Sequence, residues 1–160
     1  MHLAQKTKAA ELAMALTWGY AALPEAIEWA DEQILYTDVP DNTLFDLSLA
    51  TGPNEAAGYL RALSEGTDEW LNLAYFLCRF HTAKTMNLKD ASQLAKHLYM
   101  VAQYDDPPEP FRAFTHHWDA IDLAGDGTYG NSEDCIESFL NDIRNVIVAS
   151  GGPEFKFRSV

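Results

Sequence analysis

The sequence predicts an all-α fold: a single-domain multi-helix bundle or compact stack of about eight short helices. Apolar residues recur at a spacing near 3.6, and the alternation typical of strands is almost absent. Capping and helix-breaking residues stand at the ends of these periodic segments. With 160 residues, 48% of them hydrophobic, the chain is large enough to form one core.

Four helices are expected in the first part of the chain, over residues 3–17, 24–36, up to about 50, and 53–64. Gly19 can adopt the left-handed conformation that ends the first helix. Pro24 and Pro53 suit the first position of a helix, where a missing N–H costs nothing. Asp38 is the expected cap of the third helix, whose apolar residues are Leu44, Phe45, Leu47 and Leu49.

The second part predicts helices over 68–85, 87–104, 111–123 and from 132 onward, with Thr67, Asn87 and Ser132 as caps. The helix over 68–85 is apolar on nearly all sides, which predicts a central position in the core. The segment 105–110 contains three prolines and is expected to be a loop. Residues 151–160 are expected to be extended or disordered.

No linker divides the chain, so residues 1–160 are expected to form one helical domain. No sequence repeat of fixed period is found, which leaves a solenoid as the alternative. Cys78 and Cys135 lie in apolar helical patterns, favouring buried free thiols over a disulfide. The N-terminus lacks a secretory signal and no segment approaches the roughly 20 apolar residues of a membrane span, so a cytoplasmic location is expected.

The charge of the chain is strongly negative and unevenly distributed. Its 24 acidic and 11 basic residues give a formal net charge of -13. Between Glu11 and Glu69 the acidic residues are opposed by a single basic one, Arg61. Such a field disfavours nucleic acid and anionic lipid and attracts cationic partners. The alternative interpretation is that the acidic surface only keeps the protein in solution.

The second predicted helix is the candidate interaction surface. Ile27, Ala30 and Ile34 form an apolar stripe, whereas glutamates form an acidic stripe on the opposite side, with two aromatic residues near it. Aromatic side chains surrounded by charge are typical of binding hot spots. The alternative is that the helix packs on two sides and buries both aromatic rings. The predicted partner-binding residues are Glu25, Glu28, Trp29, Glu32, Tyr36, Asp38 and Asp41.

Few residues suggest catalysis or metal binding. Adjacent residues of a helix point about 100° apart, so His116 and His117 are not expected to bind one ion from within a helix. Apolar residues surround Cys78 and its neighbour His81, which predicts an inert thiol. We therefore expect no enzyme activity, cofactor or metal site. A metal-dependent hydrolase is the minor alternative, with His81, His116, His117 and Asp119 as its residues.

The segment 126–137 has a partial calcium-loop pattern, with acidic residues at its first and twelfth positions. Its third and fifth positions lack carboxylate or carboxamide side chains, and Asn131 replaces the glycine that the sixth position requires. A turn between two helices explains the segment better than a calcium site.

Three segments resemble a known family: 16–20 (Leu-Thr-Trp-Gly-Tyr), 25–31 (Glu-Ala-Ile-Glu-Trp-Ala-Asp) and 46–49 (Asp-Leu-Ser-Leu). Together they resemble small bacterial all-helical immunity proteins of polymorphic-toxin and contact-dependent inhibition systems. The resemblance implies a protein that binds and neutralises a cognate toxin domain in the cytoplasm, without catalytic residues. Because many such toxins are cationic nucleases, an acidic surface suits the partner. A helical adaptor that binds a basic protein segment is the alternative function.

Overall fold

The structure, a computed structural model, describes residues 1–104 and 106–151. Helical segments account for 72% of these residues and no strand occurs in them, which confirms the all-α prediction. None of the described helices has the length and apolar content that crossing a bilayer requires. In chain order the elements are α1 (Leu3–Trp18), α2 (Leu23–Tyr36), α3 (Asn42–Ser48), α4 (Pro53–Leu63), α5 (Glu69–Leu77), the 3₁₀ turn η1 (Cys78–Phe80), α6 (Leu88–Tyr104), the 3₁₀ turn η2 (Phe111–Thr115), α7 (His117–Gly125) and α8 (Ser132–Ala149).

Contacts divide the described residues into two compact units, which separate between Phe76 and Leu77. The prediction that residues 1–160 form one domain stays a prediction. The predicted tail 151–160 lies, except for Gly151, outside the described residues.

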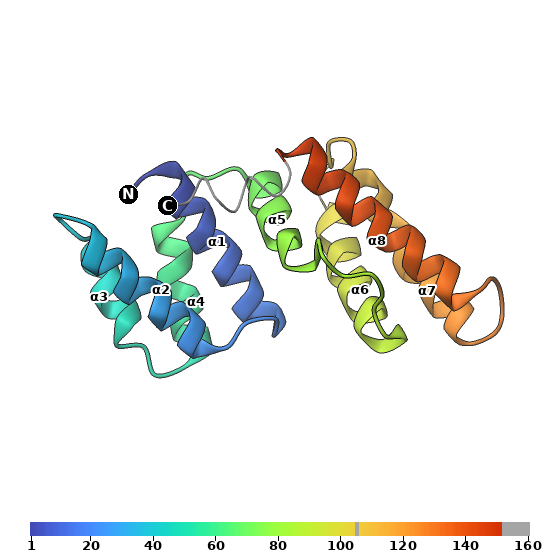
Figure 1. Ribbon diagram of the computed structural model, residues 1–160, viewed down its shortest axis with the longest axis horizontal. Helices are drawn as coiled ribbons and strands as arrows, with labels where there is room; N and C mark the ends of the chain where they lie inside the picture. The colour runs from blue at the N-terminus through green and yellow to red at the C-terminus, as the bar shows by residue number, and fades with distance from the viewer. Residues whose placement is uncertain (105, 152–160) are drawn as a thin grey trace. The chain divides into compact units, whose positions relative to one another are not determined.

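The first unit is a group of helices in which α1 packs against α4 and α2 against α3, while α3 also packs against α4 (Figure 1). Its core is rich in alanine, whose small side chain lets helix axes approach closely. Leucines fill the space between the alanines. The fully buried side chains include Ala9 and Leu12 of α1, Ala26 and Ala30 of α2, Leu47 of α3, and Ala56 and Leu60 of α4.

Glu11 is a buried carboxylate in α1 and therefore does not contribute to the acidic surface counted from the sequence. Only 2% of its side chain is exposed, and Lys8 Nζ lies 2.5 Å from its Oε2. A charge can be buried when a hydrogen-bonded opposite charge accompanies it. Along the chain, the first carboxylates after Lys8 that reach the surface therefore belong to α2.

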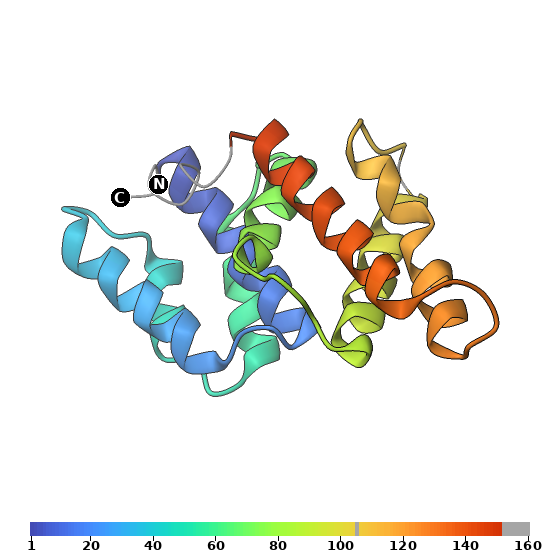
Figure 2. The same cartoon turned by 45° about the vertical axis from the view of Figure 1, so that its right-hand side comes forward.

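The second unit contains α6, α7 and α8, with η2 packed against all three (Figure 2). Its core is formed by side chains that recur every three or four positions, as amphipathic helices require. Ser92 of α6 donates a hydrogen bond of 2.5 Å to Asp122 of α7 and so links these two helices. The fully buried core side chains include Leu94, Leu98, Phe114, Ile121, Phe139 and Ile143.

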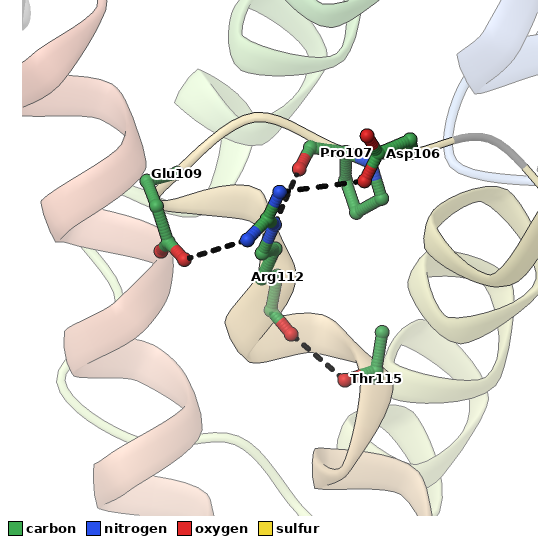
Figure 3. Close-up of polar contacts among 5 residues, drawn as sticks. All are labelled: Asp106, Pro107, Glu109, Arg112 and Thr115. Atoms are coloured by element: carbon green, nitrogen blue, oxygen red, sulfur yellow. Dashed lines mark hydrogen bonds and ion pairs between the residues drawn. The ribbon is translucent and has the colours of Figure 1, made fainter.

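Arg112 holds the proline-rich loop that precedes η2, as Figure 3 shows. Its Nε donates a hydrogen bond of 2.9 Å to the carbonyl of Pro107. Its terminal nitrogens lie 3.3 Å from a carboxylate oxygen of Asp106 and 3.7 Å from one of Glu109. These groups are exposed, so each ion pair contributes about 0 to 1 kcal/mol. The loop prediction is confirmed for the described residues 106–110, of which only the last two form a turn leading into η2.

Asp41, not the predicted Asp38, is the N-cap of α3. Its carboxylate accepts a hydrogen bond of 2.9 Å from the backbone N–H of Thr43. A capping oxygen must reach an N–H two or three positions later. Two positions after Asp38 stands Pro40, which has no N–H. The predicted cap was also wrong because α3 begins at Asn42, four positions after Asp38, so the Asp38 side chain is too far from the first N–H groups of the helix.

Two further caps are shifted by one residue, and one prediction is confirmed. Asp68 accepts from the N–H of Leu71 at 2.7 Å, in place of the predicted Thr67. Asn131 accepts from the N–H groups of Glu133 and Asp134, in place of Ser132. Asn87 accepts from the N–H of Asp90, as predicted. Neighbouring polar residues are all competent caps, so the sequence locates a helix start only to within a residue or two.

Two predicted helices are interrupted. The segment 68–85 forms α5 and η1 and then leaves the helical conformation, while 111–123 consists of η2 followed by α7. The break in the second case is His116, with φ of -128° and ψ of -9°. Neither glycine nor proline stands at these breaks, so the apolar periodicity continues across them.

We expect Phe76→Ala to lower the free energy of unfolding by about 3 to 5 kcal/mol, the range for truncating a buried aromatic side chain. Phe76 is fully buried, and its ring meets those of Trp18 and Tyr20 edge to face, with centroids 5.0 and 5.5 Å away. Tyr129→Ala, at a residue 79% exposed, is the control and should change stability by less than about 0.5 kcal/mol. Urea unfolding of both variants is the measurement, and equal stabilities would contradict the assigned core.

Candidate partner-binding surface

Exposed apolar side chains gather on one part of the first unit, in α2, α3 and the loop between them. Among the described residues, five of the twelve exposed large hydrophobic side chains lie between positions 35 and 49. Isolated exposed apolar residues need no explanation, but a group of them marks a site of interaction. We call this group the α2–α3 apolar patch, and its members are Leu35 (77% exposed), Tyr36 (86%), Val39 (85%), Phe45 (45%) and Leu49 (79%).

The patch is exposed because α3 has two apolar sides and only one of them reaches the core. Leu44 and Leu47 are buried. Phe45 and Leu49, the C-cap of α3, are four positions apart and therefore lie on one side of this helix, away from Leu44 and Leu47. The two neighbours of this seven-residue helix, α2 and α4, leave the side that carries Phe45 uncovered. The second apolar side is left facing outward.

The patch extends over both helices. Ser48 of α3 donates a hydrogen bond to Asp31 of α2, which fixes how far the two helices are shifted along each other. Because a short loop joins them, the two helices run antiparallel. Leu35, one turn after Asp31, is then level with Phe45, one turn before Ser48. The apolar residues of α2 and α3 thus form one group.

Exposed carboxylates accompany the patch in α2, in α3 and in the loop between them. Glu28, Glu32, Asp38 and Asp46 are all exposed. Between Lys8 and Arg61 the sequence contains no lysine, arginine or histidine. This stretch therefore contributes only negative charge to the surface, although the positive charges of Lys6 and of the N-terminal amino group reach the Asp41 carboxyl.

Most of the predicted partner-binding residues lie on this surface. Glu28, Glu32 and Asp38 are exposed, as is Tyr36 at the end of α2. Glu25, in the first turn of α2, is half-buried and contributes less to the exposed charge.

Trp29 is a correction, because its ring lies in the core and not beside the acidic stripe. Only 8% of the residue is exposed, and it belongs to the same buried cluster as Ala26 and Ala30. The helix α2 packs against both α3 and α4, so its buried side is wider than the predicted stripe of Ile27, Ala30 and Ile34. The alternative prediction for the second helix is that both aromatic rings are buried. It is confirmed for Trp29 and wrong for Tyr36.

Asp41 is exposed but already engaged as the cap of α3. The N–H of Thr43, and then its hydroxyl, lower the pKa of the Asp41 carboxyl from its usual value. The charge of Asp41 thus has two effects. It stabilises the N-terminus of α3, which carries Phe45, and it adds to the negative charge of the surface.

Sequence reasoning missed Leu35, Val39, Phe45 and Leu49 as surface residues. A usable signal was present for two of them, since Phe45 and Leu49 are centred about 150° from Leu44 and Leu47 on a helical wheel. For Leu35 and Val39 no signal was available, because their exposure depends on where α2 ends.

The residues considered for chemistry lie in the second unit. His81 Nδ1 is 2.5 Å from the carbonyl of Cys78, and Asp119 is exposed on α7. Cys78 is buried and outside any disulfide, as predicted, whereas Cys135 is also outside any disulfide but only half-buried. Among the described residues, one group of His, Cys, Asp or Glu side chains has metal-binding proximity, and it consists of His116, His117 and Asp142.

No protein-family model, curated protein or solved structure matches this chain. The surface described above, and the residues that build it, are therefore the basis for proposing a function.

We expect Asp41→Ala to destabilise the protein by about 1 kcal/mol, since it leaves the first N–H groups of α3 without their acceptor. Asp38→Ala is the matched control: it removes the same charge three residues earlier, at an exposed position that does not cap the helix. Thermal unfolding of the two variants tests this assignment. A larger loss for Asp38→Ala would restore the cap predicted from the sequence.

Proposed function

We propose that this protein is an immunity-type inhibitor that binds and neutralises a cognate bacterial toxin domain with a cationic surface, such as a nuclease. The observation that carries the proposal is the α2–α3 apolar patch inside a stretch without any basic residue. Two of the three segments that resemble immunity proteins, 25–31 and 46–49, belong to the helices that build this surface.

The two kinds of residue supply different parts of the binding free energy. Apolar side chains that leave water on binding contribute about 25 cal/mol per Å² of buried area. Carboxylates at the edge of the patch contribute less affinity, but they accelerate encounter with a cationic partner and disfavour anionic ones. An apolar centre with a charged rim is the usual organisation of a specific protein interface.

Such binding would inhibit a nuclease by occupation of its substrate site. A nuclease groove is cationic because it must neutralise phosphates. An acidic protein surface satisfies the same cations, and the apolar contacts add affinity that a nucleic acid backbone lacks. In this proposal the protein acts in the cytoplasm, where the toxin meets its substrate.

The adaptor alternative uses the same surface for a short basic segment. The two functions differ in what the partner must be. An inhibitor requires the folded toxin domain and protects cells that produce it, whereas an adaptor binds an isolated basic peptide equally well.

We expect the double substitution Glu28→Lys/Glu32→Lys to slow association with the proposed cationic toxin domain about tenfold at low salt. The difference from wild type should shrink as salt shortens the Debye length from about 30 Å at 0.01 M to about 3 Å at 1 M. Stopped-flow binding across this salt range is the measurement, with growth of toxin-producing cells as the second readout.

The control is Glu133→Lys/Glu137→Lys in α8, which has the same four-residue spacing, the same exposure and the same change in net charge. It should associate nearly as fast as wild type. Equal slowing by both pairs would mean that only net charge matters, and no slowing by either would remove α2 from the interface. Melting temperatures of all variants show whether they are folded.

We expect Tyr36→Ala to accelerate dissociation of the complex about tenfold, because an exposed aromatic ring that becomes buried is a typical hot spot. Tyr129→Ala is the matched control, since Tyr129 is a tyrosine of similar exposure, 79% against 86%, outside the patch. Surface plasmon resonance gives both dissociation rates. Should the two variants dissociate alike, the α2–α3 apolar patch is not the binding surface.

A further inference from the structure

His116, His117 and Asp142 bring three donor atoms together in the second unit. Each residue offers a ligand atom, and the three atoms lie within 4.8 Å of one another. Two of the residues stand at the start of α7 and the third comes from α8. We propose that these side chains form a binding site for a divalent transition-metal ion of the zinc type. This inference is independent of the partner-binding function proposed above.

The two imidazoles converge because His116 is not helical. Its φ of -128° and ψ of -9° place it before the first turn of α7, whereas His117 is the first residue of that helix. Their ring centroids are 4.8 Å apart, with 34° between the ring planes. The prediction that His116 and His117 cannot share an ion required both residues to belong to one regular helix. Because His116 lies outside α7, this requirement is not met.

Packing holds His117 and Asp142 in place. The ring of His117 lies against those of Phe114 and Phe139, with centroid distances of 6.5 and 5.2 Å. Asp142 follows Phe139 by three positions and so shares its side of α8. His117 Nε2 and Asp142 Oδ2 are 2.6 Å apart. Two ligands are thus already oriented toward each other by buried aromatic side chains.

The donor set selects the class of ion. Two imidazole nitrogens and one carboxylate oxygen suit zinc and its first-row neighbours, whereas magnesium and calcium prefer oxygen ligands. Bonds of about 2.1 Å in a tetrahedral site place neighbouring donors about 3.4 Å apart. This value lies between the 2.6 Å of the His117–Asp142 pair and the 4.8 Å limit of the group, so the spacing of the three donors is compatible with one shared ion.

The site is open on one side. His117 is buried and Asp142 half-buried, but His116 is exposed. An ion can therefore enter from solvent beside His116. Three protein ligands leave a fourth position for water or another ligand, as in open zinc sites.

The test is calorimetric titration of the untagged, full-length protein with Zn²⁺ after dialysis against a chelator. We expect one ion per chain, and a melting temperature that rises with Zn²⁺ because the ion binds the folded state. Mg²⁺ should neither bind nor stabilise. The substitutions His116→Gln and Asp142→Asn should each weaken Zn²⁺ binding at least tenfold and abolish the thermal shift.

His2→Gln is the control, because it removes an exposed histidine at the other end of the chain and should leave binding unchanged. His116→Gln is the decisive variant, since its side chain is exposed and its loss should not affect folding. Melting temperatures in chelator verify that each variant is folded. Absence of binding to the wild type, or equal binding by His116→Gln and wild type, would overturn the proposal.

Discussion

The packing of α3 against α2 is the constraint on which the proposed surface depends. Leu44 and Leu47 can be buried only if one side of α3 faces the core of the first unit. The helix α3 completes two turns, and its neighbours α2 and α4 cover the side that carries these leucines but not the opposite one. Burial of one leucine pair therefore exposes Phe45 and Leu49, and the Ser48–Asp31 hydrogen bond aligns them with the end of α2.

In the second unit the comparable constraint is the interruption before α7. A continuous helix over 111–123 would direct His116 and His117 apart, whereas the non-helical backbone at His116 lets their rings approach. The aromatic residues Phe114 and Phe139 then fix His117 opposite Asp142. The grouping of three potential ligands is thus a consequence of one backbone conformation and two buried rings.

The existence and order of the eight α-helices could be predicted from apolar spacing and capping residues, because both signals are local. The identity of several caps could not, since Asp38 and Asp41, or Asn131 and Ser132, compete at neighbouring positions. Trp29 shows a different limit: it belongs to a buried cluster that includes residues of α4, which begins more than twenty residues later. Asp142 was missed as a partner of His117 for the same reason, since 25 positions separate them.

An exposed apolar group is a liability, because it can pair with the same group on another copy. The surrounding carboxylates oppose this outcome. Two copies that approach through this surface bring its carboxylates together, and repulsion between like charges costs several kcal/mol. A cationic partner would meet the opposite situation, since its charges would lower the same energy. In the proposed function, the absence of lysine, arginine and histidine between Lys8 and Arg61 would therefore favour partners of opposite charge over further copies of the protein.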